Sequence, residues 1–545
     1  MLRSTTDLLG AEVVHLLEVE VGGQVMRFAT EAVEIETAAG DTLVYLEGLG
    51  ELELGTSFDG SSDAAIEVEL DSDVAWSTVI AQHVRVERAP ATIRRWVDGV
   101  LEDAEVLLTG RVAGLNYGEQ GEPVSFAVVR QLRSSSREIP PIGATIDSTT
   151  WPSRAGTYET DEKVLGVPYP VVFGTPGNIG GEIVPATEAM LVEKDTAVLF
   201  PSSRLLIAGH RVVAATVTIF DTTDEGLIVS NSATVVHEQD AVGRWCALVD
   251  PEAAGFATVD HGRSWYVGWD GVAFSGGRPG GITGAGDLVE YLIRTFTSTR
   301  LDAGRFAAVR ELLNAYRIDL AVVGARVTVD ELLAEVLPLL PVEPRQGADG
   351  LWFRPRRVVA SAADVVARLD ADVGAVDRAS PIRWESGDVV NEVTIEYAGE
   401  RGSGRMLRRL TVGARGGGSP DALDPGLPGA DARVVGSYRA RLSQQLFGEV
   451  LPLLISAPSV YDPATAARIA RDAIEQRALP RRAVGYTGGP EYLALQEGDV
   501  VILNDSAVGL ADVYAEVRDA VAGGPTVGIP LLLLDDPVML ERLAG

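Results

Sequence analysis

The chain has 545 residues, too many for one hydrophobic core, and its 46% hydrophobic and 23% charged residues are typical of a globular protein with several domains. Asp and Glu number 78 against 46 Lys and Arg, and the net charge of −32 disfavours binding to nucleic-acid phosphates or to anionic membranes. The single cysteine, Cys246, excludes an intramolecular disulfide and a cysteine-based zinc site, and it is typical of a reducing compartment.

Residues 1–132 are predicted to form an N-terminal β-barrel domain. No long apolar run precedes Glu12, so we expect no signal peptide, and no apolar stretch approaches the roughly 20 residues that span a bilayer. Apolar and acidic residues alternate from Leu17 to Val21, and Gly22-Gly23 separates them from a partner run at Val25–Phe28, which predicts a hairpin. Further strands are predicted at Ile66–Leu70, Val84–Glu87, Ile93–Val97 and Ala104–Leu108. We expect a soluble protein folded in a cytoplasm.

Residues 133–180 are predicted to be an extended Pro-rich connector, because proline removes backbone donors and is excluded from the middle of a sheet. Residues 181–285 are predicted to form a middle β domain. In that domain Leu205–Ala208 and Val212–Val217 flank a Gly-His-Arg turn, and Trp265–Trp269 precedes an Asp-Gly turn.

Residues 286–385 are predicted to form a helical α/β domain. Apolar residues at helical spacing predict one helix over Asp287–Arg294, and Asp302 is the expected N-cap of a second helix over Gly304–Tyr316. Two more helices are predicted, at Asp330–Leu337, which Pro338 ends, and at Ser361–Leu369, which Ser361 caps.

Residues 386–545 are predicted to form a C-terminal β-barrel domain with a helix. Val389–Tyr397 is a predicted strand, and Arg415–Gly429 is a Gly/Pro-rich loop. Asp462 followed by Pro463 is the strongest helix start in the chain, and this helix is predicted to reach Ala478. Strands are expected at Arg482–Tyr486 and Val500–Leu503. The predicted fold class is thus α+β and β-rich, with two barrel-like β domains, a middle β domain and a helical α/β segment.

No constellation of catalytic, cofactor-binding or metal-binding residues stands out. The chain has no Gly-Lys dipeptide and therefore no P-loop, and the glycine-rich run Gly276–Gly286 lacks the spacing of a dinucleotide site. The histidines are scattered without helical i, i+4 pairs; they are His15, His83, His210, His237 and His261. We therefore predict a protein that is not an enzyme and that binds no cofactor or metal.

Two alternatives remain open. Cys246 with His261 as its base would suit a β-rich cell-wall or polysaccharide hydrolase, phage-borne or secreted, although a buried inert thiol and a surface histidine are the simpler interpretation. Trp265, Tyr266 and Trp269 would suit a carbohydrate-binding adhesin, although alternating strand aromatics more often belong to a core or an interface.

Four short motifs resemble the tail hub, or baseplate hub, proteins of the tail tips of long-tailed bacteriophages and related gene-transfer particles. Their order along the chain also resembles that family. They are the strap Leu165–Gly174, the Leu205–Val212 segment with Gly209-His210, the strand Asn391–Tyr397, and the helix Pro463–Ala478 followed by Leu495–Val501.

The resemblance implies a structural virion protein. It would form a homotrimeric ring at the distal end of the tail tube, assembled in the host bacterial cytoplasm, and would line or close the DNA channel. Implied partners are the distal tail protein or tube ring and tip, fibre or tape-measure proteins, without specific nucleic-acid binding or membrane insertion. Two barrels of related fold per chain would present six similar surfaces to a sixfold tube. Acids such as those of Glu18–Glu20 and Glu67–Glu69, which alternation places on one strand face, would repel DNA from the lumen.

Overall fold

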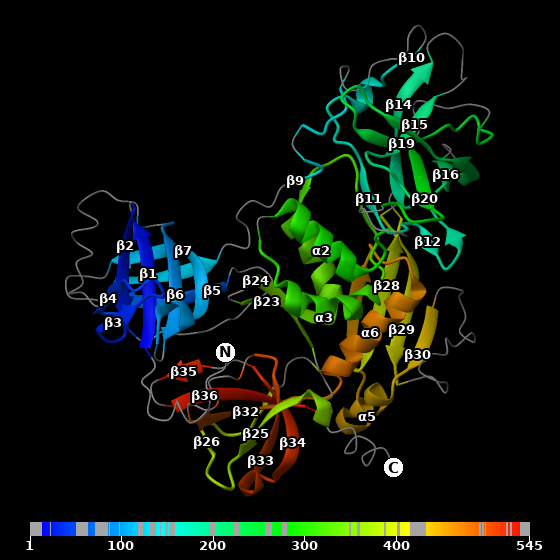
Figure 1. The fold of residues 1–545 in the computed structure, drawn as a ribbon. Helices are drawn as coiled ribbons and strands as arrows, with labels where there is room; N and C mark the ends of the chain where they lie inside the picture. The colour runs from blue at the N-terminus through cyan, green and yellow to red at the C-terminus, as the bar shows by residue number, and fades with distance from the viewer. Residues whose placement is uncertain are drawn as a thin grey trace. The chain divides into compact units, whose positions relative to one another are not determined.

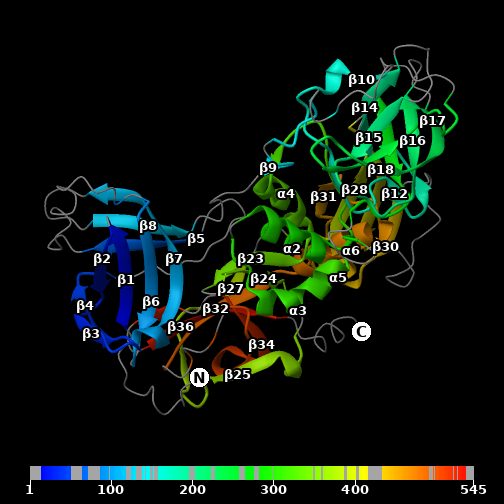
Figure 2. The ribbon, with the colours of Figure 1, turned by 45° about the horizontal axis from the view of Figure 1, so that its top comes forward.

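The structure is a computed structural model (Figures 1 and 2). It describes residues 14–21, 23–50, 64–70, 86, 88–96, 99–117, 124–130, 138–141, 143–147, 151, 158–195, 203–222, 228–256, 264–274, 281–297, 299–347, 350–356, 360–385, 389–400, 404–414, 432–489, 492, 495, 497–518, 521–523 and 526–534. The chain divides into two compact units. Unit 1 comprises 1–134, 343–387 and 480–545, and unit 2 comprises 135–342 and 388–479.

An N-terminal barrel-like sheet forms the first part of unit 1. Its described strands are β1 (Val14–Val21), β2 (Gln24–Ala29), β3 (Val33–Glu36), β4 (Thr42–Glu47), β5 (Ala64–Leu70), β6 (Pro90–Trp96), β7 (Glu105–Tyr117) and β8 (Val124–Arg130), in the order β3-β4-β2-β1-β6-β7-β8-β5. The predicted β1–β2 hairpin is confirmed, since Val21 pairs with Gln24 across a turn in which Gly23 has a φ of +82°.

The N-terminal sheet closes on itself just after β4. Leu49 donates its N–H to the carbonyl of Ala29 at the end of β2 (3.0 Å), and it also bridges Leu70 at the end of β5. Inward-facing apolar side chains of β1, β2, β5, β6, β7 and β8 form one buried cluster, with Phe28 and Phe126 among the largest. The alternation seen in the sequence therefore separates a barrel interior from its outer face.

A second barrel-like sheet lies at the other end of unit 1's sequence. Its described strands are β25 (Val365–Asp370), β26 (Val376–Arg378), β27 (Arg383–Glu385), β32 (Arg481–Gly488), β33 (Val500–Asp505), β34 (Leu510–Val517), β35 (Val521–Gly523) and β36 (Thr526–Leu533). The path runs β25-β33-β34-β36-β32-β26, with β27 added to β32 and β35 to β36. The end strands β25 and β26 are consecutive in the chain, so a short turn connects the two ends of the sheet. A hairpin of β23 (Val342–Gly347) and β24 (Gly350–Pro355) precedes them.

The two barrel-like sheets share one circular strand order. With the β3–β4 hairpin set aside, the N-terminal path of paired strands is β2-β1-β6-β7-β8-β5, and with β27 and β35 set aside the C-terminal path is β25-β33-β34-β36-β32-β26. Numbered by position in the chain, the first path reads 2-1-4-5-6-3 and the second reads 1-4-5-6-3-2. The two paths give one circular order when the ends of each are joined, at the Leu49–Leu70 bridge in the first sheet and at the short connection between β25 and β26 in the second. The two sheets differ in the direction of one strand pair: β1 runs antiparallel to β6, whereas β25 runs parallel to β33.

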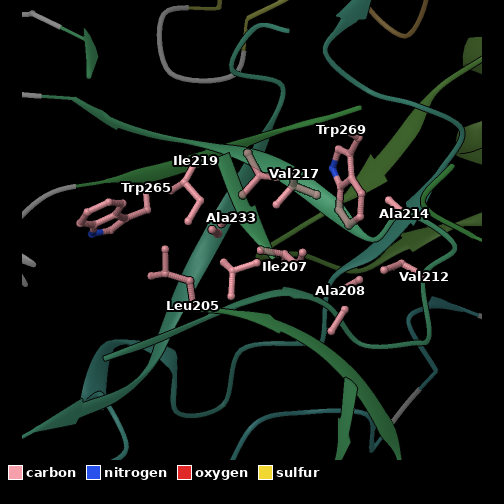
Figure 3. Packing of buried hydrophobic residues seen from close by; sticks show 14 of the residues in the cluster. Leu205, Ile207, Ala208, Val212, Ala214, Val217, Ile219, Ala233, Trp265 and Trp269 are labelled. Atoms are coloured by element: carbon pink, nitrogen blue, oxygen red, sulfur yellow. The ribbon is translucent and has the colours of Figure 1, made fainter. Parts of the chain in front are cut away.

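Unit 2 contains the middle β sheet, with the described order β17-β16-β20-β14-β15-β19-β18. Its strands are β14 (Thr187–Asp195), β15 (Arg204–Ala208), β16 (Thr216–Thr222), β17 (Ile228–Thr234), β18 (Val236–Gln239), β19 (Trp245–Val249) and β20 (Trp265–Trp269), and β10 (Tyr158–Glu159) pairs with β14. Figure 3 shows Leu205 and Ile207 of β15 packing with Trp265 and Trp269 in the core of this sheet. The predicted strand Trp265–Trp269 is confirmed.

Short strands connect the strap region to the rest of unit 2. Strand β9 (Glu138–Ile139) pairs with β22 (Val327–Thr328), and β11 (Val171–Phe173) pairs with β21 (Leu320–Val322). The remaining short pair is β12 (Asn178–Ile179) with β13 (Glu182–Ile183). Such two- and three-residue strands agree with a chain segment rich in proline.

Helices and a four-stranded sheet complete unit 2. The helices are α2 (Ala285–Phe296), α3 (Ala303–Asn314), α4 (Val329–Val336), α5 (Tyr438–Phe447) and α6 (Pro463–Arg477). The described sheet order is β30-β29-β28-β31, made of β28 (Glu392–Gly399), β29 (Met406–Gly413), β30 (Ala432–Gly436) and β31 (Pro452–Ala457). The predicted N-caps Asp302 and Asp462 are confirmed, as each accepts a hydrogen bond from a backbone N–H of the first turn.

The predicted fold class, β-rich and α+β with several domains, is confirmed. The helix predicted at Ser361–Leu369 is wrong. Ser361 does cap a single 3-10 turn, but β25 begins at Val365, because β-branched valines follow and their backbone pairs with β33. Helix α5 was not predicted. Residues 386–545 contribute strands both to the second barrel-like sheet and to the four-stranded sheet, and the division into five domains stays a prediction.

Several predictions fall partly or wholly on residues outside those described: the strand Val84–Glu87, the loop Arg415–Gly429, and the first part of the run Gly276–Gly286. None of the described helices is long and apolar enough to cross a membrane.

Candidate functional site

The strap motif and the Gly209-His210 motif, 35 residues or more apart in the sequence, form one junction in unit 2. The strap residue Tyr169 is 1% exposed, and its hydroxyl donates to Asp240 Oδ2 (3.0 Å). The next strap residue, Pro170, offers its carbonyl to the N–H of Gly209 (2.7 Å). The strap is therefore hydrogen-bonded to the loop after β15 rather than lying loosely over it.

His210 provides the second connection to the strap. Its Nε2 accepts the N–H of Val172 (3.1 Å), and Nδ1 lies 3.0 Å from the carbonyl of Arg211, to which a protonated Nδ1 donates. The imidazole edge packs on Phe274, with ring centroids 4.7 Å apart. Burial lowers the pKa of His210 to about 4, so the ring stays neutral and Nε2 keeps the lone pair that holds the strap.

Asp319 anchors the end of the strap. Its Oδ1 accepts the N–H of Thr175 (2.6 Å), and its own N–H donates to the carbonyl of Ser459 (2.8 Å). Gly174 is required beside it, because its φ is +76° and a Cβ there would lie 2.1 Å from Asp319 Oδ1. One buried carboxylate thus connects the strap, the start of β21 and the turn before α6. Burial raises the pKa of Asp319 to about 7.

The junction between the strap and the loop after β15 requires a residue without a side chain at Gly209. A Cβ at this position would lie 2.5 Å from the Cβ of Tyr169 and 3.2 Å from the carbonyl oxygen of Pro170. We expect Gly209→Ala to displace the strap and to destabilise this region by about 1–3 kcal/mol, the usual cost of overpacking a core. Hydrogen exchange at the amides of Val172 and Gly209 should accelerate accordingly.

The matched control is Gly304→Ala on α3. A Cβ at Gly304 meets only Asp302 Oδ1 at 3.5 Å, an ordinary contact, and alanine favours a helix. Protection of the strap amides should be unchanged in this variant. Equal effects of the two substitutions, or none from Gly209→Ala, would contradict the steric role of Gly209.

Asn391, the first residue of the third motif, joins α5 to the four-stranded sheet. It is fully buried; its Oδ1 accepts the N–H of Leu451 (2.7 Å), and its Nδ2 donates to the carbonyl of Glu449 (3.0 Å) and to Ser443 Oγ (3.3 Å). A side chain with both a donor and an acceptor can replace the missing backbone partners of this loop. The motif residue is thus explained by structure and not by chemistry on a ligand.

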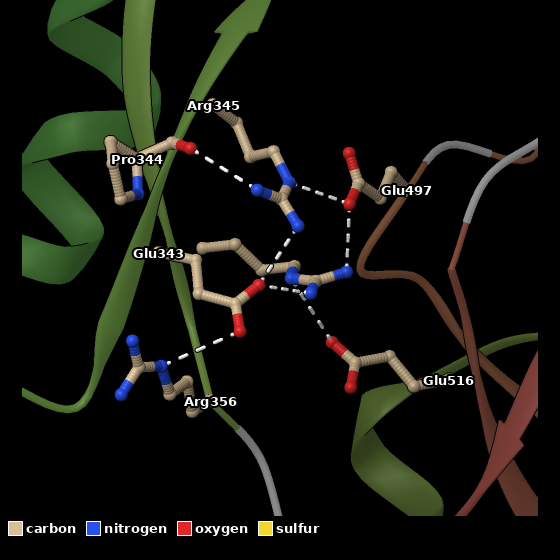
Figure 4. A network of polar contacts seen from close by, with 7 residues as sticks. Glu343, Pro344, Arg345, Arg356, Glu497 and Glu516 are labelled. Atoms are coloured by element: carbon tan, nitrogen blue, oxygen red, sulfur yellow. Dashed lines mark hydrogen bonds and ion pairs between the residues drawn. The ribbon is translucent and has the colours of Figure 1, made fainter. Parts of the chain in front are cut away.

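The fourth motif, Leu495–Val501, lies beside a buried cluster of charges in unit 1 (Figure 4). Arg354 is 3% exposed; it pairs with Glu343, with Glu497 (2.9 Å) and with Glu516 (3.8 Å). Arg345 joins Glu497 (2.6 Å) and Glu343 (2.8 Å). Burial alone would raise the pKa of Glu343, but Arg354, Arg345 and Arg356 outweigh it and lower that pKa.

Gly498 of the same motif leaves room for the stem of Arg354. Its φ is +88°, and a Cβ there would lie 3.2 Å from Arg354 Cδ. Arginines and glutamates balance in this cluster, so it holds parts of the fold together and leaves no charge for a ligand.

Of the two residues weighed for catalysis, the structure describes only Cys246, and its surroundings do not suit a nucleophile. Cys246 is fully buried, and burial, with Asp240 nearby, raises the pKa of its thiol to about 12, opposite to the thiolate that a nucleophile needs. His261 lies outside the described residues. Among those described, no group of three or more His, Cys, Asp or Glu could hold a metal ion.

The aromatic residues weighed for sugar binding lie mostly inside. Trp265 and Trp269 are buried in the middle-sheet core, 2% and 0% exposed, and only Tyr266 is partly exposed. Of the acids expected to line a channel, Glu18 is paired with Arg27 (3.1 Å) and Arg94 (3.7 Å) and accepts the hydroxyl of Tyr45 (3.0 Å). Its charge is therefore compensated locally, whereas Glu20 and Glu69 are exposed.

Comparisons with known proteins add little. No protein-family model matches the sequence, and no curated protein matches it. Two solved structures are similar in part. One is the prophage tail protein gp18 from Listeria monocytogenes EGD-e, with a TM-score of 0.27 at 10% identity over 63% of this chain and 87% of that one. The other is a chain of the virion of a native gene transfer agent particle, with a TM-score of 0.32 at 12% identity over 72% of this chain and 88% of that one. TM-scores this low do not show a shared fold.

Proposed function

We propose that the chain is a structural protein of the tail of a long-tailed bacteriophage or related particle, a tail hub that assembles as a homotrimeric ring at the distal end of the tail tube. The observation that carries this proposal is the shared circular strand order of the two barrel-like sheets. The four motifs that resemble hub proteins also support it, because each has a structural role. Two of them hydrogen-bond the strap to the loop after β15, one joins α5 to the four-stranded sheet, and one leaves room for a buried arginine.

A repeated barrel suits a ring between parts of different symmetry. Three copies with two similar barrels each would offer six similar surfaces to a sixfold tube, with heterologous contacts that close on themselves. Its neighbours would be the distal tail protein or tube ring on one side and tip, fibre or tape-measure proteins on the other. Exposed acids such as Glu20 and Glu69 would face the DNA path and repel phosphate over about a Debye length, roughly 8 Å.

The mass of the assembled full-length chain tests this function. We expect native mass spectrometry to give three times the chain mass of 57.7 kDa, and a map of the virion to place this density at the distal end of the tail. The two barrels should lie at one height around the axis and alternate. A monomer in intact particles, a ring of six copies, or a neutral or positive channel wall would each count against a part of the proposal.

A further inference from the structure

We propose that copies of this chain contact one another through the β3–β4 hairpin of one copy and the β31 edge of the next. This inference rests on the proposed function in one respect only, that the chain self-assembles. The two surfaces have complementary charge, and both combine exposed apolar side chains with an open sheet edge.

The hairpin surface is acidic and partly apolar. Residues 28–84 contain 13 Asp and Glu and no Lys or Arg. In the hairpin, Ile35 and Tyr45 are buried, so the alternate residues point outward: Glu34 and Glu36 are exposed, and Glu34 pairs in register with Val44.

Two large apolar side chains of this hairpin are more exposed than is usual for a strand face in contact with water. Val44 is 54% exposed and Leu46 is 59% exposed. In the described sheet β3 is an end strand, so one side of its backbone has no partner strand there. An acidic strand edge with exposed apolar neighbours suits a basic and apolar partner.

The β31 surface is the basic and apolar surface that such an edge would suit. Exposed large hydrophobic residues concentrate in nine consecutive positions, from the end of α5 into β31: Leu446 (62%), Phe447 (42%), Val450 (48%) and Leu454 (59%). Strand β31 pairs with β28 alone and ends the described sheet. Within the four-stranded sheet, register places Leu454 on the same face as Arg409, which is 57% exposed and lies 3.8 Å from Glu396 of β28.

Charge favours a second copy as the occupant. Residues 401–479 of unit 2 contain 11 Arg and seven Asp and Glu, so this region is basic in a chain whose net charge is −32. The β3–β4 hairpin, residues 33–47, contains four Asp and Glu and no Lys or Arg, so contact between two hairpins would bring like charges together. Contact between the hairpin and the β31 edge brings opposite charges together and covers both apolar patches. Because the two surfaces differ, the contact is heterologous and can close a ring.

The experiment is a charge swap in the full-length chain, read by native mass spectrometry and analytical ultracentrifugation. Glu34→Arg with Glu36→Arg should weaken self-association about tenfold or more, and the association of the unchanged chain should weaken with added salt. The control is Glu311→Arg with Glu335→Arg, the same change of charge at exposed positions of α3 and α4, and it should assemble like the unchanged chain.

Complementary reversal separates this contact from a general effect of charge. Arg441 is an exposed residue of α5, the helix that precedes β31. Arg409→Glu with Arg441→Glu, in a chain whose hairpin is unchanged, should also weaken association, and a chain carrying both reversals should regain it. Failure of the double reversal to regain association, or an equal effect of the control, would overturn the proposed contact.

The outcomes also separate this inference from the proposed function. A trimer unaffected by all the reversals keeps the hub and rejects this contact. A dimer that follows the charge swap keeps this contact and rejects the threefold ring. A chain that stays monomeric at every concentration rejects both. The same conclusion holds if the reversals change only how compact that monomer is.

Discussion

Arg354→Met should destabilise the second barrel-like sheet by about 3–5 kcal/mol, the usual cost of removing one partner from a buried ion pair. Methionine keeps a stem against Gly498 but removes the guanidinium. Arg345 can still pair with Glu343 and Glu497, whereas Glu516, 3% exposed, would lose its ion pair with Arg354 and keep its charge in a buried position. Hydrogen exchange in peptides from β33 and β34 should accelerate by the corresponding factor.

A double-mutant cycle identifies the cause. Adding Glu516→Gln removes the buried carboxylate charge that has lost Arg354, so the double variant Arg354→Met/Glu516→Gln should recover most of the lost protection. The control Arg383→Met removes an exposed arginine of β27, a strand that pairs with β32, and exchange in β33 and β34 should stay as in the unchanged chain. If Glu516→Gln restores nothing, the cost of Arg354→Met arises from lost packing instead.

Elements with strong local signals were predicted well. The β1–β2 hairpin follows from alternation around two glycines, and α6 follows from Asp462 and Pro463 at its start. The wrong helix at Ser361 had a real capping box, with Asp364 as its partner. What overrode it was parallel pairing of β25 with β33, more than a hundred residues later in the chain, which no local pattern records.

The strap junction was predicted only as two separate motifs. The sequence contains Gly209-His210 and the proline strap, but nothing in it places Gly209 against Tyr169, because that contact requires the folded middle sheet. Asp319 was not singled out at all. Its partner Thr175 is 144 residues away, and an aspartate before a short strand is indistinguishable in sequence from a turn residue. A long-range carboxylate clamp can be recognised only once the chain has folded around it.

Asp319→Asn should change how the stability of unit 2 depends on pH. The buried carboxyl has its pKa raised from its ordinary value of 3.8 to about 7, first by burial and then by Asp462, against the N–H groups of Thr175 and Tyr461. The folded state therefore binds a proton between about pH 4 and pH 7 that the unfolded state releases. Its contribution to stability is fully present below about pH 4 and is lost as the pH rises through 7, by at most about 1.4 kcal/mol per pH unit.

The asparagine variant keeps a side-chain oxygen for the N–H of Thr175 but cannot titrate. The measured quantity is the free energy of unfolding of the unchanged chain minus that of Asp319→Asn. Both free energies come from urea unfolding midpoints, measured by pulse-labelling hydrogen exchange in peptides spanning Val171–Thr175 and Ile318–Val322. We expect the difference between them to fall steadily from pH 4 to pH 7.

His210 acts with the opposite sign in the same range. Its folded pKa of about 4 lies below the ordinary histidine value of 6.5, so its contribution is lost as the pH falls. Because His210 is present in both proteins, its contribution cancels in the difference unless the strap couples it to Asp319. Gly304→Ala on α3, which changes no titratable group, should give a flat difference over this range. A flat difference for Asp319→Asn as well would mean that Asp319 binds no extra proton in the folded chain and holds the strap as a charged carboxylate at all these pH values.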